Sequence, residues 1–227
     1  MSSESLLTAT DRQLRLLLWI ALYLVISGCR TVSAVTISPT SPVELSNGSP
    51  PAIPTSIPDL ITALSSSSAE VRIGAAHRLG NMGPAAQPAV PALARNLNYP
   101  HTYDVREAAA EALGAIGPTA KPSIPVLIVV LLTDSSLHVR RASAEALERI
   151  GDVSAIPALA SGLADQDSGV EVQCAKAIAA LAHQDFPDAN STIYRVGNDG
   201  VPLIVTAARE WWQSEGQTQT WLSSDVQ

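Results

Sequence analysis

Residues 124–151 read IPVLIVVLLTDSSLHVRRASAEALERIG, and they show most clearly the pattern on which the fold is built. Pro125 stands where a helix can begin, because the backbone N–H groups of a first helical turn have no partners to lose. The apolar residues behind it keep the spacing i, i+3, i+4, i+7 of one helical face. After a polar break, a second apolar stripe ends before Gly151, a residue that readily adopts the left-handed conformation of a helix end. The stretch therefore predicts a pair of short helices.

The same pattern recurs along the chain. Similar tetrapeptides begin each first helix and start 33, 34, 32 and 45 residues apart: Ile57-Pro58-Asp59-Leu60, Val90-Pro91-Ala92-Leu93, Ile124-Pro125-Val126-Leu127, Ile156-Pro157-Ala158-Leu159 and Val201-Pro202-Leu203-Ile204. Three second helices begin with related tripeptides: Glu70-Val71-Arg72, Asp104-Val105-Arg106 and His138-Val139-Arg140. The returning loops 83–88 and 117–122 are nearly identical. Because one helix pair cannot bury its apolar stripe alone, we expect neighbouring pairs to stack around a continuous core.

The composition favours helices over strands. The 227 residues include one Phe, four Tyr and four Trp, although 46% are hydrophobic, so the core must be built mainly from Ala, Leu, Ile and Val. Such side chains suit closely packed helices better than an aromatic-rich β-sandwich. The net charge of −7, with basic residues scattered along the chain and adjacent only at Arg140-Arg141, argues against nucleic-acid binding. Two cysteines are too few for a disulfide framework.

Residues 57–182 resemble HEAT repeats of the short kind also called phycobilisome-lyase-like, including the acidic-Val-Arg start of the second helix. The resemblance implies an all-α fold, a right-handed α-solenoid of about four helix pairs. The units would cover residues 57–89, 90–123, 124–155 and 156–182. The resemblance also implies that the motif arginine of one unit bonds to a carboxylate or carbonyl of its neighbour.

The fourth unit departs from this pattern. It has Gly169-Val170-Glu171 in place of the acidic-Val-Arg start and Ala182 where the glycine stop is expected. We therefore expect the arginine ladder to stop after Arg140 and the solenoid to close there. Residues 183–216 would form an insertion, with Phe186 and Tyr194, and a C-terminal cap helix over 201–212. The aromatic rings of this region would cover the open end of the stack, the alternative being an aromatic ligand patch, and residues 217–227 would be a frayed tail.

The amino terminus has the layout of a secretory signal. Behind Arg12 and Arg15, the uncharged segment 16–28 has 13 residues, fewer than the roughly 20 that a membrane-spanning helix needs. Its end, Ile26-Ser27-Gly28-Cys29, resembles the lipobox of bacterial lipoproteins. The resemblance implies cleavage of residues 1–28 and a lipid on Cys29, which would anchor the protein on the periplasmic side of the cell envelope. Arg30 follows the cysteine in place of the aspartate that would act as an inner-membrane retention signal, so the outer membrane is favoured. The alternative to a lipoprotein is an uncleaved anchor or a buried cysteine.

A tether is expected between the anchor and the repeats, over residues 29–56. From Thr31 to Ser56, 17 of 26 residues are Ser, Thr, Pro, Gly or Asn. Such a stretch cannot bury enough apolar surface to offset its ordering entropy, so it predicts a disordered leash.

No catalytic set is recognisable in the sequence, so we expect a protein that is not an enzyme and has no cofactor. The four histidines are dispersed over different units, and no metal-ligand spacing is present. Cys174 lies among apolar residues, so we expect it to be a small buried side chain. The enzymatic alternatives that the resemblance suggests are a bilin lyase and a deoxyhypusine-hydroxylase-like oxygenase. The chain has no adjacent His-Glu pair, which the hydroxylase would use, and a signal peptide would place a lyase in the wrong compartment.

The second helices offer a candidate face for a protein partner, which the sequence does not identify. Positions two and six residues past each motif valine should align across the stack on its concave side, giving a mixed-charge stripe. Its charged members are His77, Glu107, Glu111, Arg141, Glu145 and Lys176. The alternatives are a merely solvated face, or binding by the 183–200 insertion. The sequence thus predicts a monomeric, membrane-anchored scaffold or adaptor.

Overall fold

The computed structural model describes residues 55–98, 102–189 and 195–218, and all of them lie in one compact unit. The predicted signal peptide over 1–28, Cys29 and nearly all of the tether lie outside the described residues, as do Tyr194 and most of the tail. Within the described ranges there is no β-strand, and the fold is an all-α solenoid as the repeat predicted. The α-helices are α2 (Ile57–Ala63), α3 (Ala69–Asn81), α4 (Val90–Leu97), α5 (Tyr103–Ile116), α6 (Ile124–Thr133), α7 (Leu137–Ile150), α8 (Ile156–Gly162), α9 (Ser168–Ala182) and α10 (Leu203–Ser214).

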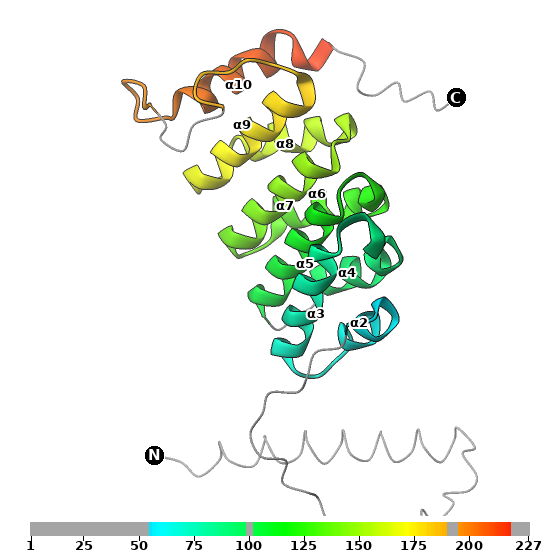
Figure 1. The fold of residues 1–227 in the computed structure, drawn as a ribbon. Helices are drawn as coiled ribbons and strands as arrows, with labels where there is room; N and C mark the ends of the chain where they lie inside the picture. The colour runs from blue at the N-terminus through cyan, green and yellow to red at the C-terminus, as the bar shows by residue number, and fades with distance from the viewer. Residues whose placement is uncertain (1–54, 99–101, 190–194, 219–227) are drawn as a thin grey trace, which may run out of the picture. The chain divides into compact units, whose positions relative to one another are not determined.

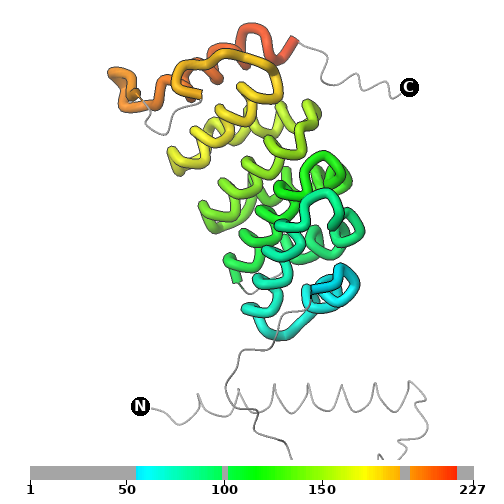
Figure 2. Tube along the Cα trace, in the orientation of Figure 1, coloured from blue at the N-terminus to red at the C-terminus, as the bar shows by residue number. Residues whose placement is uncertain are grey.

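The helices stand in two columns (Figures 1 and 2). The second helices α3, α5, α7 and α9 pack one on the next, and the first helices α4, α6 and α8 do the same beside them. Each of α2, α4, α6 and α8 has proline in its first turn, where no backbone hydrogen bond is lost. Between the columns lie leucines that are fully or almost fully buried, one or more from each pair, among them Leu60, Leu79, Leu93, Leu113, Leu127, Leu147 and Leu159. The spacing of apolar residues within each helix is therefore what holds the two columns together.

One apolar stretch of the described residues, Tyr103–Thr133, is long enough to cross a membrane, with a mean hydropathy of 1.7. It comprises α5, α6 and the 3₁₀ segment Gly117–Ser123 between them. Of its apolar window, 44% is buried inside the protein.

Small residues set how closely the second helices approach. A Cβ added at Gly114 of α5 would lie 2.9 Å from the Cα of Ala146 in α7, and one at Gly80 of α3 would lie 3.1 Å from the Cα of Ala112 in α5. Because these neighbours are backbone atoms, the helices would have to move apart to admit a methyl group.

Gly114→Ala is expected to lower the free energy of unfolding by about 1–2 kcal/mol. Overpacking of this kind costs about 1–3 kcal/mol, and the better helix propensity of alanine offsets up to about 1 kcal/mol. Urea unfolding followed by circular dichroism measures the change. Gly80→Ala is the matched control with the longer contact and should cost less, so an equal or larger loss there would contradict the packing argument.

Backbone conformation at the helix ends matches the sequence pattern at three units and differs at the fourth. Gly83, Gly117 and Gly151 have φ of +57°, +72° and +77°. In the fourth unit α9 continues through Ala182 and ends at His183, which takes φ 54° and ψ 40°. A left-handed histidine thus ends this helix as glycine does in the other units. It lies one residue after position 182, where the repeat pattern predicts the helix to end.

His183→Gly is expected to stabilise the protein by up to about 1 kcal/mol. The left-handed conformation costs a non-glycine residue about 1–2 kcal/mol, which glycine would avoid. The greater freedom of glycine in the unfolded chain reduces this gain in stability by about 0.4–1 kcal/mol. Thermal unfolding measures the difference. His183→Ala keeps the Cβ and should bring no such gain, so equal stabilisation by both variants would show that the imidazole, and not the backbone, is responsible.

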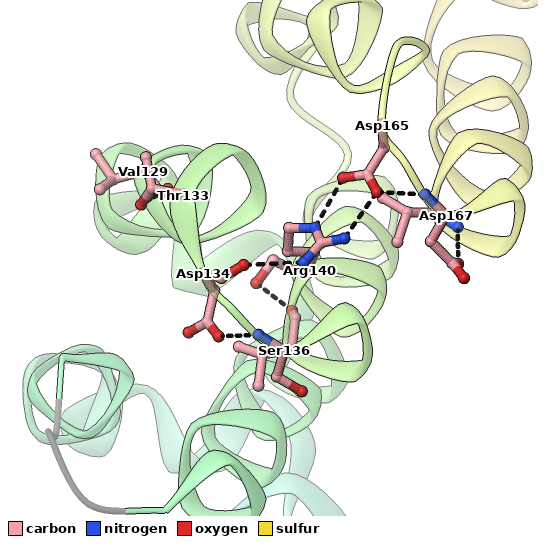
Figure 3. A network of polar contacts seen from close by, with 10 residues as sticks. Val129, Thr133, Asp134, Ser136, Arg140, Asp165 and Asp167 are labelled. Carbon is pink, nitrogen blue, oxygen red and sulfur yellow. Dashed lines mark hydrogen bonds and ion pairs between the residues drawn. The ribbon is translucent and has the colours of Figure 1, made fainter.

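Two of the motif arginines, Arg106 and Arg140, link successive units as the resemblance implied. Arg106 of α5 donates to both carboxylate oxygens of Asp134, from Nε at 2.6 Å and Nη2 at 2.9 Å. Arg140 of α7 repeats this with Asp165, with both bonds at 2.7 Å, and its Nη1 donates to the backbone oxygen of Asp134 at 2.9 Å (Figure 3). The side chains of Arg140 and Asp165 are only 15% and 11% exposed, so this link lies largely out of water.

The links lower the pKa of both aspartates. At Asp165 the largest cause is the hydrogen bond from Arg140. At Asp134 burial raises the pKa, but the hydrogen bonds from Arg106 and the Ser136 amide, together with the charges of Arg106 and Arg140, outweigh it. Both carboxylates are therefore held in their charged form.

The ladder does not stop at Arg140 but continues with its charges reversed. Glu171 of α9 occupies the place of the motif arginine, and it accepts a hydrogen bond from Nη2 of Arg209 in α10. Arg209 also donates to the backbone oxygen of Leu163 at the end of α8. The expectation that the ladder ends after Arg140 was therefore wrong in one respect, because the last guanidinium is supplied by the C-terminal helix.

The aromatic side chains of the C-terminal region pack inward. Helix α10 crosses the end of the stack against α8 and α9 (Figure 1). Trp211 is 7% exposed, and its ring lies 6.0 Å from that of Phe186 and 6.4 Å from that of Trp212. A tryptophan buried in this way belongs to the core, which favours the cap over the aromatic ligand patch.

Candidate partner-binding groove

A groove runs across the second helices of three successive units. His77 of α3, Glu111 of α5 and Glu145 of α7 are 34 residues apart along the chain, so the stacking places them at the same level of neighbouring helices. Together with Arg149 they form the polar border of a cavity of about 380 Å³. Its floor consists of small residues, among them Gly80, Gly114, Ala115 and Ala142. The volume lies at the lower end of the range of about 300–1,000 Å³ that is typical of ligand sites.

The charges of the groove are unevenly paired. Arg149 Nη2 lies 2.6 Å from Glu145 Oε1, one turn earlier on the same helix. Glu111 Oε2 lies 3.7 Å from Nε2 of His77, whose side chain carries charge only when it is protonated. Among the described residues, this histidine is the one ion-pair partner of Glu111. All four side chains are between 43% and 54% exposed and are open to a partner.

The groove brings together three of the six charged residues expected from the sequence. His77, Glu111 and Glu145 line it, whereas Glu107 and Arg141, on α5 and α7, do not. Arg149 and Asn81 also line the groove, although they were not expected from the sequence. Counting ten residues past each motif valine, instead of two and six, would have found Asn81, Ala115 and Arg149.

Lys176, the sixth residue, lines a separate pocket of about 460 Å³ toward the end of the solenoid, with Glu148, His183 and Asp185. Gln173 Nε2 donates to Oε2 of Glu148 at 2.8 Å. Burial, with a smaller effect from the charge of Glu145, raises the pKa of Glu148 above its ordinary value. The candidate face expected from the sequence is thus divided by α7 into two hollows.

Cys174 is buried, as the sequence predicted, and its sulfur fills the space beside Gly162. An added Cβ at that glycine would lie 2.5 Å from Sγ. Burial raises the pKa of the thiol to about 12, so it is protonated at neutral pH and is not a nucleophile. In the described part of the chain, no group of three or more His, Cys, Asp and Glu side chains could hold a metal ion.

Comparison with known proteins points to one repeat family. The sequence model of HEAT repeats matches residues 48–114 and 103–179, which is more than half of the chain. Similar solved structures include an engineered protein, with 21% identity over 71% of this chain and 73% of that chain and a TM-score of 0.49. Another is the complex of CpcE and CpcF of phycocyanin lyase from Nostoc sp. PCC7120. It has 23% identity over 64% of this chain and 71% of that chain, and a TM-score of 0.47. No curated protein matches the sequence.

Proposed function

The chain belongs to the HEAT-repeat family, and from this premise we propose that it is a non-catalytic scaffold that binds a protein partner through the groove of α3, α5 and α7. The observation that carries the proposal is the groove itself, whose exposed charged border and floor of small residues extend over three stacked units. Solenoids of stacked repeats use extended surfaces of this kind for binding.

The proposal includes attachment to a membrane through a lipid on Cys29. Its support is the sequence Ile26-Ser27-Gly28-Cys29 behind a short apolar segment. Three acyl chains would hold the protein far more strongly than the single chain that gives marginal binding. Confinement to one membrane would raise the effective concentration of the repeats for a partner on that membrane.

Site-specific photo-crosslinking in the native cells tests the binding face. A photoreactive amino acid at Ala115, on the exposed floor of the groove, should give one dominant crosslinked protein that mass spectrometry identifies. The same amino acid at Gln87, an exposed position outside the groove, is the control. Equal yields of the same adduct from both positions would contradict a specific groove interaction.

The anchor and the absence of catalysis have separate tests. Mass spectrometry of the amino-terminal peptide should find an acylated Cys29, and an intact segment 16–28 would defeat the lipoprotein assignment. Absorbance spectra and metal analysis of the purified full chain should show neither a bilin nor iron in stoichiometric amount. A stoichiometric amount of either one would favour an enzyme over a non-catalytic scaffold.

A further inference from the structure

The repeat contains an occupied and a vacant copy of the same small site. In the occupied copy, Arg149 pairs with Glu145 four residues earlier on α7. Its aliphatic stem lies over Gly114 of the neighbouring helix α5, since a Cβ added at that glycine would be 3.5 Å from Cδ of Arg149. A glutamate, an arginine stem and a glycine floor thus form one unit of contact between α7 and α5.

The vacant copy lies 34 residues earlier. Glu111 takes the place of Glu145, Gly80 takes the place of Gly114, and Ala115 stands where the arginine would be. A Cβ added at Gly80 would lie 3.5 Å from the Cβ of Ala115, at which that side chain ends. The floor beyond it belongs to the cavity of about 380 Å³, and Glu111 faces it with His77 alone as an ion-pair partner among the described residues.

Resting on the function proposed above, we infer that the groove binds an arginine side chain of the partner, in the position over Gly80 that Arg149 occupies over Gly114. The guanidinium would donate to the carboxylate of Glu111, and the three methylene groups would lie on the floor of small residues. Arginine suits this position better than lysine because its planar head can donate two parallel hydrogen bonds to one carboxylate.

Binding of Nα-acetyl-L-arginine amide to the full-length protein tests the inference. In two-dimensional NMR spectra of the 15N-labelled chain, the amide signals of Gly80 and Ala115 should shift saturably. Nα-acetyl-norleucine amide, which lacks the guanidinium, should not produce these shifts. Glu111→Gln should weaken binding by roughly three- to five-fold, the upper range for a pair with this exposure. Glu210→Gln, which removes the same charge from an exposed position on α10, should leave the affinity unchanged.

Two further variants use the repeat itself. Ala115→Arg supplies the missing side chain from α5, so it should abolish binding of the arginine amide while thermal unfolding shows an intact fold. Arg149→Ala opens the copy over Gly114, so it should raise the number of bound arginine amides from one to two and shift the signal of Gly114 as well.

The inference is overturned if Glu111→Gln binds the arginine amide as tightly as the natural chain, if Ala115→Arg still binds it, or if the natural chain does not bind it. These outcomes are distinguishable from failure of the proposed function. A crosslinked partner at Ala115 without arginine binding would support the scaffold function and contradict only the arginine site. Arginine binding without a crosslinked partner would support the arginine site and contradict the scaffold function.

Discussion

Replacing Trp211 with alanine is expected to lower the free energy of unfolding by about 3–5 kcal/mol, the usual cost of removing a large aromatic side chain from a core. Trp211 is 7% exposed and packs against Phe186 and Trp212 at the open end of the solenoid. Its loss would uncover apolar side chains of α9, because a terminal unit has no further repeat to protect it. Urea unfolding monitored by circular dichroism measures the change.

Trp212→Ala is the matched control for this prediction. Trp212 is the neighbouring residue on α10, but its side chain is only partly buried against the core. Its replacement should therefore cost distinctly less. Hydrogen exchange of the Trp211→Ala variant should accelerate first in α9 and α10, since stability in a repeat stack is lost locally from its ends. A loss below about 1 kcal/mol for Trp211→Ala would contradict the capping role.

Arg140→Ala is expected to cost about 3 kcal/mol at neutral pH, near the lower end of the range for breaking a buried pair. The variant loses both bonds to Asp165 and the bond to the backbone oxygen of Asp134. It leaves a carboxylate that is 11% exposed without the guanidinium that compensates for its desolvation. The change removes the link between the third and fourth units. Lys121→Ala is the control: it breaks the ion pair between Lys121, whose side chain is 55% exposed, and Asp152. This variant should cost less than about 1 kcal/mol.

The pH dependence of the same variant gives an independent check. The pKa of Asp165 is lowered in the folded protein, chiefly by Arg140, so its contribution to stability is present above the unfolded value of about 3.9. That contribution is lost as the pH falls through the lowered, folded pKa. The difference in stability between the natural chain and Arg140→Ala should therefore shrink below about pH 4. A difference that stays constant down to pH 2 would show that the link contributes packing and no charge interaction.

Some features of the site could be read from the chain and others could not. The 34-residue spacing sufficed to align His77, Glu111 and Glu145, because repeats of equal length that stack one on another keep equivalent residues level. It did not show that Glu107 and Arg141 lie outside the groove. Those residues occupy the same helices, and only the angle and distance between helices decide which positions border a hollow.

The all-α class, the repeat and the helix ends of the first three units could be read from the sequence, because these depend on interactions within one unit, whereas the cap helix expected over 201–212 spans Leu203–Ser214. Proline in the first turn, a positive-φ glycine at the end and apolar spacing of about 3.6 residues act over a few residues of chain. Three features follow from packing and not from the repeat pattern: the pairing of Arg209 with Glu171, the approach of Ala115 to Gly80 and the left-handed His183. The first two depend on side chains that are far apart in sequence and meet only after packing, and His183 is left-handed because α9 runs one residue further than its repeat predicts.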